Sequence, residues 1–160
     1  MISYIGDLEL GTTVDITDPC YNKDVCCRMT VYCEPGLYKG YIEMSDEGDW
    51  GMRVAAISIF KGNKIWGIEE MEYIGSIGVD AGLAGFFNNK PDFSDTEWIE
   101  FCDKINDCDK INEGDAWNLY NGIFSSSGYG DGCYSVYANE ERNAFTIVFI
   151  EDEYGDEEED

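Results

Sequence analysis

The stretch MRVAAISIF, residues 52–60, is almost continuously apolar. A run of this length and composition predicts a buried strand at the centre of a β-sheet. A Gly-Asn turn follows at residues 62–63, and residues 65–74 then alternate between apolar and polar side chains, which predicts a second strand. The middle of the chain therefore favours a mostly β fold.

The sequence on the N-terminal side of this run continues the β pattern. Residues 2–17 alternate loosely and predict short strands before an Asp-Pro turn at 18–19. Residues 25–33 and 37–44 flank the turn sequence EPG at 34–36, so we expect them to form a hairpin.

The C-terminal half contains further strand patterns separated by glycine-rich segments. Residues 117–124 predict one strand, and residues 133–137 and 144–150 predict a final hairpin. The segments 75–85 and 125–132 are dense in glycine and predict loops.

One helix is predicted over residues 94–112. Ser94 and Glu97 have the spacing of a capping box, in which each residue satisfies a backbone N–H of the other. Apolar residues then recur with a helical period, acids and lysine lie opposite them, and Gly114 ends the pattern.

Together these patterns predict a single globular domain over residues 1–150 of the mostly β (α+β) class. We expect a β-sandwich or open barrel of about ten short strands with one amphipathic helix packed on it. Residues 151–160 hold eight acids and predict a solvated, disordered acidic tail.

The net charge is the most unusual property of the composition. The chain has 34 acidic and 10 basic residues, a formal charge of −24, and it stays strongly acidic without the last ten residues. Nucleic acid binding and attraction to anionic membranes both need lysine and arginine, so this charge argues against both. It favours cations and basic proteins as partners.

The absence of histidine removes several kinds of chemistry. Catalytic Ser-His-Asp and Cys-His arrangements, histidine-ligated zinc and histidine pH switches are all excluded. The seven cysteines are an odd number, and the N-terminal residues lack the basic and apolar segments of a signal peptide. We therefore expect a cytoplasmic protein with reduced thiols.

Three stretches, taken together, resemble one family. They are IGDLEL at residues 5–10 with the Asp-Pro that follows, GVDAGLAGFF at 78–87, and SSGYGDGCY at 126–134. In this order they resemble the bacterial and phage family called domain of unknown function 4241. The resemblance implies a shared fold and a phage-related origin, but no activity. The acidic tail and the Asn that follows Phe87 depart from the family pattern.

Three aspartates in the predicted turns form a candidate binding cluster. Asp18, Asp80 and Asp131 each lie in a predicted turn, and loops gathered at one end of the fold would let them bind Ca²⁺ or Mg²⁺. The simpler interpretation is that each aspartate hydrogen-bonds to its own turn. Arg53 interrupts the central apolar run, so we expect it to pair with Asp80 or Asp131.

The cysteines at 20, 26, 27 and 33 form a dense cluster. A zinc site would normally include a pair separated by two to four residues, which is missing here. Adjacent residues on a strand also point to opposite faces. We therefore predict that these four cysteines are small buried hydrophobic residues.

A predicted acidic face carries the main functional hypothesis. Four of its members, Asp95, Glu100, Asp103 and Asp107, lie on the predicted helix. The other three precede Gly75 and are Glu69, Glu70 and Glu72. Such an excess of acids goes beyond what solubility requires, and it could imitate nucleic acid in a basic groove. The predicted function is thus that of a non-enzymatic, phage-related protein that blocks a nucleic-acid-binding host protein, such as a nuclease or defence effector.

Two alternatives remain open. The first is a small module that binds a divalent cation or a nucleotide signal through Asp18, Asp80 and Asp131. The second, a hydrolase that relies on carboxylates, has no pair of acids that the sequence places at a catalytic distance.

Overall fold

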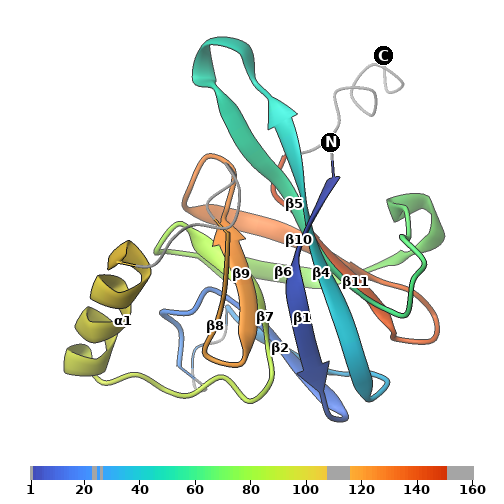
Figure 1. Cartoon of the computed structure of the whole chain (residues 1–160), viewed down its shortest axis with the longest axis horizontal. Helices are drawn as coiled ribbons and strands as arrows, with labels where there is room; N and C mark the ends of the chain where they lie inside the picture. Colours follow the sequence, from blue (N-terminus) through green and yellow to red (C-terminus); the bar gives the residue numbers. More distant parts are fainter. Residues whose placement is uncertain (1, 23–24, 26, 108–115, 151–160) are drawn as a thin grey trace.

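Two antiparallel sheets pack face to face in the computed structural model, which describes residues 2–22, 25, 27–107 and 116–150 (Figure 1). The six-stranded sheet has the order β1-β4-β5-β11-β10-β6. Its strands are β1 (Ile2–Leu10), β4 (Gly36–Asp46), β5 (Met52–Lys61), β6 (Glu72–Val79), β10 (Gly132–Ala138) and β11 (Ala144–Val148). The five-stranded sheet has the order β3-β2-β7-β9-β8. Its strands are β2 (Thr13–Thr17), β3 (Met29–Tyr32), β7 (Leu83–Phe87), β8 (Ala116–Leu119) and β9 (Gly122–Ser126).

The main core lies between the two sheets. Ile57 and Ile59 of β5 belong to one apolar cluster with Phe86 of β7 and Ile123 of β9, and all four are buried. Strand β5 pairs with β4 on one side and β11 on the other, so the prediction of a central strand from residues 52–60 is confirmed. The predicted β-sandwich with one helix is the architecture observed.

Helix α1 (Asp95–Asp107) packs on the outer face of the five-stranded sheet (Figure 1). Phe101 and Ile105 bury against Trp117 of β8 and Phe124 of β9. The predicted capping box is confirmed, because the Ser94 N–H donates to Glu97 Oε1 at 3.0 Å and the Glu97 N–H donates to Ser94 Oγ at 3.2 Å. The predicted end of the helix at 112–114 lies outside the described residues.

The predicted hairpin between residues 25–33 and 37–44 is wrong. Strand β3 pairs with β2, whereas β4 pairs with β1 and β5 in the other sheet. The buried Cys33 anchors the connection between the sheets, since its N–H donates to Thr12 O at 2.9 Å and its thiol donates to Gly11 O at 3.2 Å. The EPG sequence thus marks a crossover from one sheet to the other.

The strand predicted at residues 65–74 and the loop predicted at 75–85 are also wrong in part. A short 3₁₀ helix, η2 (Ile68–Glu70), precedes β6, and only residues 80–82 separate β6 from β7. Gly78 lies inside β6 and donates its N–H to Cys27 O at 2.9 Å. A Cβ atom at Gly78 would lie 3.0 Å from the Cys27 Cβ, so glycine here permits a close approach between two segments.

The strand predicted at residues 117–124 is a hairpin of β8 and β9. Tyr120 and Asn121 form its turn, and both have a φ of +57°. Two central residues with positive φ are typical of the type I′ turn, which is usually recognised from an Asn-Gly pair. Another 3₁₀ helix of the same length, η1 (Gly48–Trp50), occupies the loop between β4 and β5. Within the described residues, α1 is too short and too polar to span a membrane, and no other helix could do so.

Candidate functional site

Asp18 is fully buried directly after β2, and its carboxylate is used by the backbone. Oδ1 accepts the Cys20 N–H at 2.8 Å, and Oδ2 accepts the N–H groups of Asp80 and Ala81 at 2.8 and 2.6 Å. The carboxylate therefore fastens the β6–β7 turn to the end of β2. Asp18 thus hydrogen-bonds to the backbone of its own turn, which was the simpler interpretation from the sequence, and also to the β6–β7 turn.

The structure brings the loops of Asp80 and Asp131 to one end of the sandwich. Val79 and Gly132 are paired residues, and the two exposed aspartates lie next to this pair at the same end of the β6–β10 ladder. Among the described residues, however, no three Asp, Glu, Cys or His side chains are arranged to hold a metal ion. The Ca²⁺ or Mg²⁺ site stays a prediction.

Arg53 does not pair with Asp80 or Asp131, which corrects the expectation from the sequence. Its Nε donates to Trp50 O at 3.1 Å and its Nη1 to Gly128 O at 3.4 Å. The guanidinium also lies 5.0 Å from the ring centroid of Tyr129. Arg53 therefore contacts two carbonyl oxygens and an aromatic ring, and not Asp80 or Asp131. This is because β5 directs the side chain toward the 127–130 turn.

The glycine-rich loop behaves as a tight turn. Ser127 Oγ donates to Gly130 O at 2.7 Å, and the Gly130 N–H donates to Ser127 O at 3.0 Å. Gly128 and Gly130 have φ values of +62° and +109°, which glycine adopts without strain. The same turn carries Tyr129, whose hydroxyl donates to Glu47 Oε1 at 2.7 Å.

The cysteine prediction is confirmed for one of its members. Cys33 is fully buried, and Cys20 is half-buried with a thiol pKa raised by burial and then by the nearby Asp18 carboxylate. Cys27 is exposed, so the prediction is wrong there. Cys26 lies outside the described residues.

The residues of the predicted acidic face do not form one face. The acids of α1 lie at one end of the molecule, shown in yellow in Figure 1, and η2 with Glu69 and Glu70 lies at the opposite end, shown in green. Glu72 begins β6 directly after η2. Glu70 also pairs with Lys64 at 3.0 Å, and the pKa of its carboxyl is lowered first by the Gly67 N–H and then by Lys64.

The α1 outer face, which we define as Asp95, Ile99, Glu100 and Asp103, points away from the sheet. All four side chains are exposed, and Ile99 is 61% exposed although it is a large apolar residue. Asp107 ends the helix, and its side chain lies outside the described residues. The sequence pattern found the acids but did not single out Ile99.

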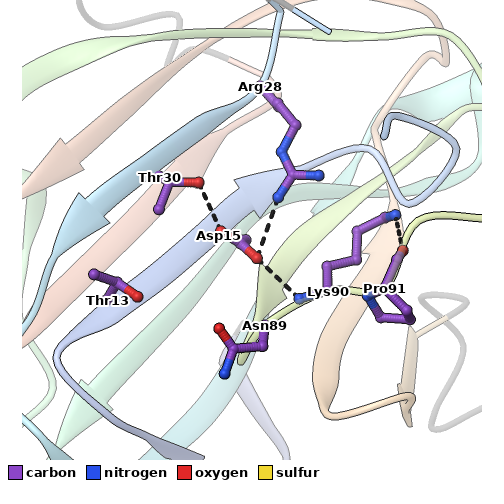
Figure 2. Close-up of a pocket in the computed structure, with 7 residues that line it drawn as sticks. All are labelled: Thr13, Asp15, Arg28, Thr30, Asn89, Lys90 and Pro91. Atoms are coloured by element: carbon purple, nitrogen blue, oxygen red, sulfur yellow. Dashed lines mark hydrogen bonds and ion pairs between the residues drawn. The ribbon is translucent and has the colours of Figure 1, made fainter. Parts of the chain in front are cut away.

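A pocket of about 410 Å³, the Asp15 pocket, was not found from the sequence (Figure 2). Asp15 Oδ1 accepts the Thr30 hydroxyl at 2.6 Å, and Oδ2 accepts the Lys90 N–H at 2.9 Å and pairs with Arg28 Nη2 at 3.1 Å. Arg28 also donates to Tyr21 O at 3.2 Å. The only sequence signal is an acid within the apolar strand TVDIT.

Lys90 closes one side of the Asp15 pocket and is 1% exposed. Its Nζ donates to Pro91 O at 2.6 Å and lies 4.6 Å from the centroid of Phe93. Burial, and then the positive charge of Arg28, lowers the pKa of Lys90 to about 8. The charges of this pocket already have partners, so the cluster fastens the segment before α1 to the outer face of the sheet.

A second cavity, the sheet groove, lies on the outer face of the six-stranded sheet. It has a volume of about 570 Å³ and is lined by the central strands β5 and β11 and by the η2 segment. Ser58 Oγ and Thr146 Oγ1 lie 2.7 Å apart on its floor, and Trp66 and Tyr137 line its sides. This cavity joins residues that are far apart in sequence, so no local motif could reveal it.

The fold and these sites define an antiparallel β-sandwich with one acidic helix on its outer surface. Comparisons with protein family models, with curated proteins and with solved structures found no match for the chain. The resemblance to the domain of unknown function 4241 therefore stays a prediction.

Proposed function

We propose that the protein is a non-catalytic interaction protein whose α1 outer face binds a basic surface of a partner protein. The exposure of Ile99 among the acids of this face is the observation that carries the proposal. Protein interfaces combine an apolar centre with a polar and charged rim, and Ile99 with Asp95, Glu100 and Asp103 has this arrangement. Ile99 is one of several exposed large apolar residues of the described chain, and it is the one that lies among the acids of α1.

The inner side of α1 supports the same function because it holds the helix rigidly. Trp98 stacks on Phe101 at 5.1 Å between ring centroids, and Phe101 packs on Tyr120 and Phe124 at 4.9 and 5.6 Å. A binding surface that is already ordered loses less conformational entropy when the partner docks. The partner therefore meets a preformed acidic surface.

The charge of the whole chain favours a basic partner. A net charge of −24 attracts a positively charged surface from a distance and speeds association at low salt. A partner surface that normally binds nucleic acid has the required charge, and the resemblance to a phage-related family favours a host nuclease or defence effector. In this function the protein covers the nucleic-acid-binding surface of its partner, so that nucleic acid can no longer bind there.

The alternative function as a cation or nucleotide module has less support. Asp18 is fully buried and its two oxygens already accept three backbone N–H groups, so the carboxylate does not face a ligand in solvent. Asp80 and Asp131 do lie at the same end of the β6–β10 ladder, but among the described residues no three such side chains are arranged to hold a metal ion.

The test is capture of partners from host lysate on the immobilised protein, followed by binding measurements with the purified partner. We expect a nucleic-acid-binding protein that elutes with rising salt and that loses its nucleic acid when this protein is added. Glu100→Lys with Asp103→Lys should slow association, and Ile99→Ser should speed dissociation about tenfold.

The matched control is Glu140→Lys with Glu141→Lys, which makes the same charge change in the exposed turn between β10 and β11. This control should leave binding close to that of the unchanged protein. Equal loss in both double variants would mean that only the net charge matters, and would contradict a role for the α1 outer face.

A further inference from the structure

The sheet groove combines a polar floor with aromatic and aliphatic walls. Ser58 of β5 and Thr146 of β11 are directly paired across the two strands, and both residues are more than nine-tenths buried. Their hydroxyl oxygens share one hydrogen bond of 2.7 Å. Because each hydroxyl has two acceptor lone pairs, the pair can accept a further hydrogen bond from a group that enters the groove.

The sides of the groove are aromatic and held in place. Trp66 and Tyr137 belong to one cluster with the buried Phe60. Lys64 Nζ lies 3.7 Å from the centroid of Trp66 and 3.0 Å from Glu70 Oε1. Glu70 Oε2 in turn accepts the Gly67 N–H at 2.9 Å, so these contacts fix the η2 side of the groove.

The charge that the groove presents is negative. Glu43 of β4 and Glu69 of η2 line it and both are exposed, whereas the nearby Lys64 is paired with Glu70. The net charge of −24 adds a field that attracts cations and repels anions. The Asp15 pocket differs, because there Arg28 already neutralises the carboxylate.

We propose that the sheet groove binds a small organic cation, an ammonium group carried on an aromatic or aliphatic body. The body lies against Trp66 and Tyr137, and the ammonium group meets the carboxylate of Glu43 or Glu69 and donates to the Ser58–Thr146 pair. The volume of about 570 Å³ lies within the range of small-molecule sites, which combine apolar walls with a few polar groups. The groove and α1 lie on opposite outer faces of the sandwich, so this site is independent of the proposed protein interface.

The test titrates the isotope-labelled full chain with 2-phenylethylamine and follows amide and indole N–H signals by NMR. We expect shifts confined to residues around Ser58, Trp66 and Thr146, with a Kd on the order of 1 mM or tighter. The uncharged 2-phenylethanol has the same body and should bind about tenfold more weakly, because it lacks the ionic contact.

Two variants test the site itself. Ala56→Phe places a ring in the groove from an outward position on β5, where aromatic residues are well tolerated, and should abolish the shifts. Glu43→Gln with Glu69→Gln should weaken amine binding about tenfold and leave 2-phenylethanol binding unchanged. The matched control is Glu100→Gln with Asp103→Asn, which removes the same charge from α1 and should leave amine binding nearly unchanged.

Three results would overturn the assignment. Equal weakening by the groove and α1 variants would show non-specific attraction to an acidic protein. Shifts spread over the whole surface would show that the groove is not the site. Binding of a capped Gly-Lys-Gly peptide as tightly as the amine would assign the groove to a lysine side chain of a partner protein instead.

Discussion

Asp18 shows how one buried carboxylate can fix the relation between two loops. Its two oxygens accept three backbone N–H groups, one from residue 20 and two from the β6–β7 turn. Hydrogen bonds to a charged acceptor contribute more than neutral ones, and a buried N–H left without a partner is destabilising. The turn that begins with Asp80 therefore depends on a residue 62 positions earlier in the chain.

Replacing Asp18 by Asn should lower the free energy of unfolding by about 2–4 kcal/mol. The amide has one acceptor oxygen in place of two, and its NH₂ group would face backbone donors. Urea unfolding of the variant and of the unchanged chain measures the difference. Asp131→Asn is the matched control, since Asp131 is exposed, and should change stability by less than about 0.5 kcal/mol. Equal effects of the two substitutions would contradict the structural role of Asp18.

Lys90 should make the stability of the protein depend on pH in the alkaline range. Its folded-state pKa of about 8 lies below the ordinary value of 10.5, because burial and Arg28 disfavour the charged form. Between these pH values the unfolded chain holds more protons than the folded chain, so the contribution of Lys90 to folding becomes more favourable as pH rises. The size of this change is on the order of 3 kcal/mol.

The measurement compares the unchanged chain with Lys90→Met at several pH values from 7 to 11. The other titratable side chains are common to both proteins, so the difference between the two reports Lys90 together with its effect on the neighbouring Cys20 thiol. We expect the unchanged chain to gain stability relative to the variant between about pH 8 and 10.5. A difference that is constant with pH would show that Lys90 has an ordinary pKa.

At the scale of the element, the start of α1 depends on its capping box. Ser94→Ala removes the hydrogen bond from the Glu97 N–H and should lower the unfolding free energy by about 1 kcal/mol. Thr96→Ala, at an exposed position two residues later, is the control and should change stability by less than about 0.5 kcal/mol. Thermal unfolding followed by circular dichroism compares them. A larger effect at Thr96 would contradict the cap.

Elements with a strong local signal could be predicted from the sequence. The capping box and helical period located α1, and the continuous apolar run located β5. The partners of strands could not be predicted in the same way, because the EPG turn is followed by a strand in the other sheet. Local sequence shows where the chain turns, whereas the pairing depends on which apolar faces meet across the core.

The same distinction explains which parts of the candidate sites could be predicted. The exposed acids of α1 follow from the helical period and were found. The Ser58–Thr146 pair joins residues 88 positions apart, and the Asp15 pocket joins three separate segments of the chain. Such sites exist only after the strands have paired, so no spacing within the sequence could indicate them.

At the scale of the whole molecule, the dominant property is an excess of negative charge that the fold does not pair internally. Arg28–Asp15, Lys61–Glu34 and Lys64–Glu70 are ion pairs among the described residues, but the chain has only 10 basic residues for 34 acids. Most carboxylates therefore repel one another in the folded state more than in the expanded unfolded chain. This repulsion is the energetic cost of keeping an acidic surface ready for a basic partner.

Salt should consequently stabilise the free protein. Raising NaCl from about 10 mM to about 0.5 M shortens the Debye length from roughly 30 Å to below 10 Å and screens the repulsion between exposed acids. If screening restores about 1–2 kcal/mol, the melting temperature rises by roughly 2–8 °C for a chain of this size. A chain shortened to residues 1–150 loses eight acids and should show a smaller rise, while sucrose at matched osmolality controls for general solvent effects. A melting temperature that falls with salt would mean that attractive pairs dominate the surface, and the acids of α1 would then be engaged within the protein and not available to a partner.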